Sequence, residues 1–117
     1  MVDKTAQCGT QKLRYPADCT YVCVCPASGK CVWTVTCPGG GVFTGEGLVA
    51  PSNPKPPHVT LAGSIGAIAK ALQKAWKRPV VVPTKLRRRR IRTRTLRGTP
   101  EQIADALGLQ LGARRGG

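Results

Sequence analysis

The stretch TYVCVCPASGKCVWTVTC, residues 20–37, decides how the first part of the chain folds. Two runs of strand-forming residues flank the turn-forming segment PASG, a pattern that predicts an antiparallel hairpin. If Cys25 faces Cys31, residues whose numbers add to 56 lie opposite one another, so Cys19 faces Cys37. Side chains alternate between the two faces of a strand, and the odd-numbered positions of both strands therefore share one face.

Six cysteines lie within 30 residues, in a segment too short to fold by apolar burial alone. Such a cluster predicts a disulfide framework. Directly opposed cysteines can reach the Cα separation that a disulfide requires. The predicted bridges are Cys25–Cys31, Cys19–Cys37 and Cys8–Cys23.

A zinc site is the alternative use of these cysteines. Structural zinc is commonly held by two CxxC knuckles, or by one CxxC with paired histidines. Here the cysteines are separated by 10, 3, 1, 5 and 5 residues, and the only histidine is His58. The spacing favours disulfides, so we predict neither a metal nor a cofactor.

Composition divides the 117-residue chain in two. Residues 39–57 are rich in glycine and proline, which is typical of a linker. It would join a cysteine-rich hairpin module at 1–38 to a basic domain at 58–112, followed by a flexible tail at 113–117. The first 57 residues carry a net charge of +2, whereas residues 58–117 carry +12 of the total of +14.

The basic part shows alternating strand and helix patterns. VTLAG (59–63) predicts a strand, and residues 64–78 predict an amphipathic helix that Ser64 would cap. PVVVP (79–83) predicts a buried strand. In RIRTRTLRG (90–98), Ile91, Thr93 and Thr95 alternate with arginines, which predicts a half-buried strand with its arginines outward.

A second helix is expected after Thr99, where Pro100 occupies the first helical position. The fold class is therefore α+β. We expect a small β-α-β-β-α domain, with two helices covering one face of its sheet, preceded by the disulfide-rich β-hairpin module.

Three motifs in the basic part carry a family resemblance. They are VTL followed by AKAL, VVVP with Leu86 three residues after Pro83, and GTPEQIADAL. With these motifs, residues 59–111 resemble the short N-terminal domain shared by secretins and TonB-dependent transducers, the STN domain. The resemblance implies a periplasmic, non-catalytic protein-interaction module that belongs to an envelope secretion or signalling assembly.

A weaker resemblance points to nucleic acid. GSIGAIAKAL (63–72) contains a GxxG motif before an apolar helix, and RTLRGTPEQIADAL (94–107) is similar to the last strand and helix of KH domains. In that family the GxxG loop clamps the RNA backbone. The resemblance implies an RNA-binding function as the alternative.

Cations are concentrated in one short segment, where seven arginines fall within eleven residues. A run of like charge this dense favours an anionic partner, although a solvated strand face would show the same pattern. The predicted anion-binding residues are Arg87, Arg88, Arg89, Arg90, Arg92, Arg94 and Arg97, with Lys70, Lys74 and Lys77 of the first helix. The partner would be a protein or another anionic surface, or nucleic acid; a membrane surface is less favoured.

Other function classes receive little support. The chain has no run of 18 apolar residues, which excludes a membrane-spanning helix. A single histidine and five scattered carboxylates offer no pairing of nucleophile and base, so we do not expect an enzyme. Disulfides persist in oxidising compartments, which predicts a periplasmic or secreted protein whose export signal lies outside this sequence, with a cytoplasmic protein as the alternative.

Overall fold

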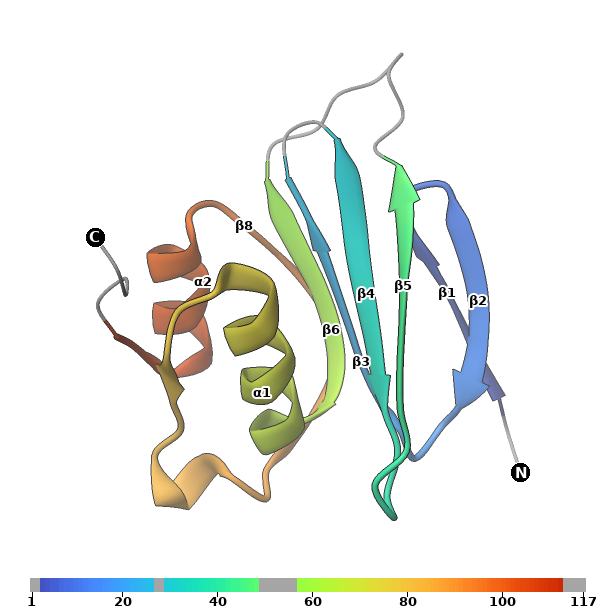
Figure 1. The fold of residues 1–117 in the computed structure, drawn as a ribbon. Helices are drawn as coiled ribbons and strands as arrows, with labels where there is room; N and C mark the ends of the chain where they lie inside the picture. Colours follow the sequence, from blue (N-terminus) through green and yellow to red (C-terminus); the bar gives the residue numbers. More distant parts are fainter. Residues whose placement is uncertain (1–2, 27–28, 49–56, 113–117) are drawn as a thin grey trace.

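The computed structural model describes residues 3–26, 29–48 and 57–112 (Figure 1). The predicted tail at 113–117 lies outside the described residues. The described elements, in chain order, are β1 (Asp3–Cys8), β2 (Gln11–Pro16), β3 (Thr20–Cys25), β4 (Lys30–Thr36), β5 (Val42–Leu48), β6 (His58–Ser64), α1 (Ile65–Trp76), β7 (Val80–Val81), the short 3-10 helix η1 (Thr84–Leu86), β8 (Arg90–Arg97), α2 (Pro100–Leu107) and β9 (Gln110–Leu111).

Five strands form the main sheet, in the order β5-β4-β3-β6-β8, and every neighbouring pair is antiparallel. Strands β3 and β4 have the predicted register, because Thr20 lies opposite Thr36 and Cys23 lies opposite Trp33. The pairing of β3 with β4 is therefore the one that the sequence predicts.

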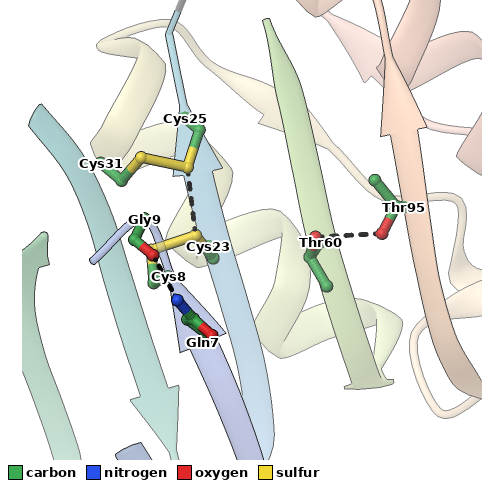
Figure 2. Close-up of a disulfide and its surroundings, with 8 residues drawn as sticks. All are labelled: Gln7, Cys8, Gly9, Cys23, Cys25, Cys31, Thr60 and Thr95. Carbon is green, nitrogen blue, oxygen red and sulfur yellow. Dashed lines mark hydrogen bonds between the residues drawn. A yellow bond between two sulfur atoms is a disulfide. The ribbon is translucent and has the colours of Figure 1, made fainter. Parts of the chain in front are cut away.

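All three predicted disulfides are present. The bridges join Cys8 to Cys23, Cys19 to Cys37 and Cys25 to Cys31, with Cα separations of 5.7, 4.2 and 4.3 Å respectively. Figure 2 shows two of them on the same face of β3, where the Sγ atoms of Cys23 and Cys25 lie 3.6 Å apart. The chain has no free cysteine.

The main sheet contains strands from both of the parts into which composition divides the chain. Strand β3, from the cysteine-rich part, pairs along its other edge with β6, from the basic part. Residues 42–48, which fall in the expected linker, form β5 and pair with β4 along their whole length. The structure therefore differs from the expected linker over these residues, and residues 49–56 of it lie outside the described part of the chain.

The two faces of the main sheet bury different cores (Figure 1). On one side, α1 and α2 pack against a cluster that includes Val22, Val59 and Leu61. On the other side, the β1–β2 hairpin covers the disulfides together with Tyr15 and Tyr21. This separation follows from strand alternation, because even-numbered residues of β3 face the helices and odd-numbered ones face the disulfides.

The helices begin and end close to their predicted bounds. Thr99 caps α2 as predicted, since its Oγ1 accepts a hydrogen bond of 3.2 Å from the Gln102 amide while the Gln102 side chain accepts one of 2.9 Å from the Thr99 amide. Helix α1 ends at Trp76, and its C-cap residue Lys77 has a left-handed φ of 56°. No helix in the described ranges is both long and apolar enough to span a bilayer.

The strand predicted at 79–83 is shorter than predicted and does not belong to the main sheet. The strand contains only Val80 and Val81, which pair with β9 in a separate two-stranded sheet. Val80 is buried whereas Val81 is 53% exposed, so the segment is not a buried strand of the main sheet. Prolines at positions 79 and 83 limit its length because a proline has no amide hydrogen to donate to a ladder.

Candidate anion-binding edge of the sheet

Strand β8 carries four of the seven clustered arginines and lies at one edge of the main sheet. Among the described strands it pairs only with β6. The Oγ1 atoms of Thr60 and Thr95 lie 3.1 Å apart across this pair, as Figure 2 shows. The opposite edge of β8 is therefore free of any described strand.

All seven clustered arginines are exposed. The chain has five carboxylate side chains, all within the described residues, and none of them forms an ion pair with these arginines. Glu46 pairs with Lys30, and Glu101 pairs with Arg78. Within the described residues, one of these arginine side chains donates a hydrogen bond to the protein: Nη1 of Arg90 donates one of 3.4 Å to the carbonyl oxygen of Asp18. The positive charge of the segment is thus not neutralised within the described protein.

The backbone of the arginine segment is fastened to the start of α1. The amide of Ile65 donates a hydrogen bond of 2.8 Å to the carbonyl oxygen of Arg89, and the amide of Gly66 donates one of 3.3 Å to that of Arg87. The Ser64 hydroxyl donates to the same Arg87 oxygen at 3.3 Å. Ser64 has the extended backbone of an N-cap residue, but its side chain does not cap; the arginine carbonyls accept the first helical amides instead.

Of the three predicted lysines, Lys70 and Lys74 lie on α1 and Lys77 is its C-cap residue, and all three are exposed. Lys70 and Arg87 line one surface groove, together with Gln73. Lys74 and Lys77 do not line that groove. The structure therefore brings one of the three lysines together with the arginine segment.

The predicted alternation along β8 is interrupted. The register slips by one residue between the pairs Leu61–Arg94 and Gly63–Ile91. As a result Ile91 and Leu96, five residues apart, both pack against the helix-side core, whereas an uninterrupted strand would place them on opposite faces. Thr93 and Thr95, predicted to be half-buried, are exposed.

Strand alternation and the slip together distribute the arginines over two faces. Arg94 lies opposite Leu61, which faces the helices, and Arg97 lies opposite His58, which faces the disulfide side because it pairs with Cys25. The side chain of Arg90 reaches the carbonyl oxygen of Asp18, just before the start of β3. Guanidinium groups therefore stand on both sides of the edge rather than forming one outward ridge.

Arg78, at the end of α1, has a structural role that its charge pattern does not reveal. Its Nη1 pairs with Glu101 of α2, and its Nε donates a hydrogen bond of 3.1 Å to the carbonyl oxygen of Gly112. The hydrogen bond from Arg78 lowers the pKa of the Glu101 carboxyl. This arginine links the ends of α1, α2 and β9 and is not available to a partner.

The buried cysteine face cannot act as a metal site in this oxidised form. The Sγ atoms of Cys8, Cys23 and Cys25 lie within 4.8 Å of one another, a spacing compatible with metal ligation. Each of these sulfurs is bonded to another cysteine, so none is the thiolate that ligation requires.

A tyrosine pair, which the sequence patterns do not single out, lies beside the disulfides. The rings of Tyr15 and Tyr21 are stacked, with centroids 5.3 Å apart and an angle of 11° between their planes. Burial raises the pKa of both hydroxyls, and the neighbouring Tyr15 adds to the shift at Tyr21. The alternation of Leu13 and Tyr15 is the signal that could have revealed β2.

In comparisons with known proteins, no protein-family model, curated protein or solved structure matches the chain.

Proposed function

We propose that the protein is a non-enzymatic interaction module that binds an anionic surface of a protein partner through the arginine-rich segment 87–97. The observation that carries this proposal is the set of seven exposed arginines with no carboxylate partner in the described structure. Like charges held this close repel one another, and an anionic partner would relieve the repulsion.

The anchored backbone supports a binding role. Hydrogen bonds from Ile65 and Gly66 fix the carbonyls of Arg89 and Arg87, so the segment does not have to be ordered when a partner binds. A binding surface that is already ordered loses less conformational entropy on association. The arginine side chains remain free to adapt to the carboxylates or phosphates that they meet.

Three disulfides support a location in an oxidising compartment. The resemblance of residues 59–111 to the STN domain supports the same location and suggests an envelope assembly as the setting. In the proposed setting the protein is periplasmic or secreted, and its partner exposes acidic residues.

Nucleic acid is the second candidate, because guanidinium groups bind phosphates as well as carboxylates. The distribution of aromatic side chains argues against single strands, on which bases would have to stack. All five aromatic residues are described: Tyr15 and Tyr21 are buried, Trp33 and Trp76 pack against the two cores, and Phe43 lies on β5 at the other edge of the sheet. None offers a stacking surface beside the arginines.

Binding to an acidic peptide and to random duplex and single-stranded DNA, measured over a range of salt concentrations, tests the proposal. Replacing Arg88, Arg90, Arg92 and Arg94 by glutamine should weaken peptide binding by about tenfold or more, since each charge-assisted contact contributes appreciably. The matched control replaces four exposed cations elsewhere by glutamine, namely Lys4, Lys12, Arg14 and Lys30.

Both sets remove the same net charge, so equal losses in the two would show that only overall charge matters and would contradict the proposal. Retention of duplex DNA with no affinity for the peptide would select the second candidate.

A further inference from the structure

We propose that β8 binds its partner by strand addition: an extended acidic peptide pairs with the free edge of β8 and becomes an additional strand of the main sheet. This inference rests on the proposed function and specifies both the partner's conformation and its chemistry. It follows from three features of the edge: its unpaired peptide groups, the two-sided placement of its arginines, and its resistance to self-pairing.

The direction of the peptide groups of β8 follows from one hydrogen bond. The Gly98 amide donates to the carbonyl oxygen of Pro57 at 3.0 Å, toward β6. In an antiparallel ladder, alternate residues direct both of their peptide groups to the same neighbour. The N–H and C=O groups of Leu96 therefore point toward β6, whereas those of Thr95 and Arg97 point away from it.

No described strand pairs with those outward groups. A row of unpaired donors and acceptors at a sheet edge is a template for another extended chain. An added strand would form main-chain hydrogen bonds to Thr95 and Arg97, in continuation of the ladder that β6 and β8 already form.

The placement of the arginines favours a strand over a flat anionic surface. Arg94 stands on the helix side of the sheet and Arg97 on the disulfide side, because they lie opposite Leu61 and His58 respectively. A flat surface such as a lipid headgroup layer would meet one of these faces. The side chains of an added strand alternate between both faces, so acidic residues at successive positions would each find a guanidinium group.

The same charges disfavour a second copy of this chain as the occupant. Strand β8 contains four arginines and no acidic residue. Pairing two such edges would place like charges directly opposite one another, which destabilises a sheet. Charge complementarity therefore selects a peptide rich in aspartate or glutamate.

Thr95→Pro tests strand addition without removing any arginine. It deletes the outward amide of Thr95 and places a ring against the approaching strand, but removes no main-chain hydrogen bond to β6, as is required for proline in an edge strand. The matched control is Thr95→Val, which also loses the hydroxyl contact with Thr60 but keeps the amide. The probe is a synthetic peptide with glutamate at successive positions, which places carboxylates on both faces of an added strand. Inorganic polyphosphate serves as an anion that has no peptide backbone.

The expected result is that Thr95→Pro raises the Kd for the peptide by about tenfold or more, while Thr95→Val leaves it within about twofold. Polyphosphate binding should be unchanged in both variants. An unchanged peptide Kd in a folded Thr95→Pro protein would overturn strand addition and leave the proposed function intact. Failure of the wild-type protein to bind either anion would overturn the proposed function itself.

A second measurement does not depend on the folding of the variant. The same peptide, N-methylated at alternate residues on the edge that would face β8, keeps every carboxylate but loses the donors. Strand addition predicts that the unmodified wild-type protein binds the methylated peptide about tenfold or more weakly than the parent peptide. Equal affinity for the two peptides would overturn the inference.

Discussion

The Oγ1 atom of Thr20 accepts a hydrogen bond of 3.0 Å from the amide of Ser64. Thr20 begins β3 in the cysteine-rich part, and Ser64 ends β6 immediately before α1. The bond therefore joins two parts of the chain that differ in composition, at the position where the sheet passes into the helix. Thr20 is 4% exposed, so this bond also satisfies a buried polar group.

Gly63, between these groups, should tolerate no side chain. Its φ is 120°, and a Cβ atom built on it would lie 2.8 Å from the Cα of Thr20. Gly63→Ala should lower the free energy of unfolding by about 2 kcal/mol or more, because it combines backbone strain with a clash against backbone atoms. Urea denaturation would measure the effect. The control is Gly41→Ala, whose nearest neighbour would be 3.6 Å away, and equal stabilities of the two variants would show that the approach at Gly63 is not tight.

The disulfides should differ in their contributions to stability. Cys19–Cys37 spans 18 residues and Cys25–Cys31 spans 6. Loop-closure entropy predicts that replacing Cys19 and Cys37 by alanine costs about 3 kcal/mol, roughly 1 kcal/mol more than replacing Cys25 and Cys31. Chemical denaturation of the two double variants tests the difference. A smaller cost for the longer loop would mean that native packing around the bridges outweighs the entropy of the unfolded chain.

Alkaline titration should reveal the buried tyrosines. The protein contains only Tyr15 and Tyr21, so tyrosinate absorbance reports on this pair alone. Burial raises both pKa values in the folded protein above the ordinary value of 10.0. Their contribution to stability is therefore fully present below pH 10.0 and is lost as the pH rises through the folded-state values.

The expected observation is an absorbance midpoint above pH 10.0 in the native protein, with a normal midpoint after reduction and denaturation. A native midpoint at the ordinary value would contradict the burial of the pair beneath the β1–β2 hairpin.

The ion pair between Arg78 and Glu101 should make stability depend on pH in the acid range. The hydrogen bond from Arg78 lowers the pKa of Glu101 below its usual 4.5, so the stabilisation is present above pH 4.5 and is lost as the pH falls through the folded-state pKa. Glu101→Gln should have a lower Tm than the wild-type protein at neutral pH. The difference should shrink in acid, whereas a difference that does not change with pH would show that the effect does not depend on the carboxylate charge and would contradict the role of the ion pair.

The local parts of the fold could be predicted from the sequence. The turn-forming residues PASG predict the register of β3 and β4, and from that register the partners in Cys19–Cys37 and Cys25–Cys31 follow by opposition. Likewise, the apolar stripe of α1 and the capping residues of α2 can be recognised from residues close together in the sequence. Each of these features depends on contacts between residues close together in the chain.

Non-local pairing is what the sequence does not show. Val22 pairs with Leu61, and no turn or spacing connects these strands. Strand β5 looks like a flexible linker because it contains Gly45 and Gly47. In the structure these glycines allow close approach, since a Cβ atom at Gly45 would clash with the Trp33 ring and one at Gly47 with the Cys8 carbonyl.

The candidate site shows the same division. The exposure of the arginines follows from their charge, whereas the edge position of β8 depends on the strand order of the whole sheet. The register slip between Leu61 and Gly63 has no clear signature in an Arg-Thr alternation. For this reason the sequence predicts one outward ridge of arginines, and the structure places them on two faces.

Residues 87–97 form the surface that we propose binds an acidic partner. Nuclear magnetic resonance can locate the bound peptide from backbone amide chemical shifts, followed during titration with the glutamate peptide. The largest changes should occur in segment 87–97, with Thr95 and Arg97 among them, and the β1–β2 hairpin should change little. Changes confined to the lysines of α1 or to the disulfide face, or no change at a saturating concentration of peptide, would contradict the proposal.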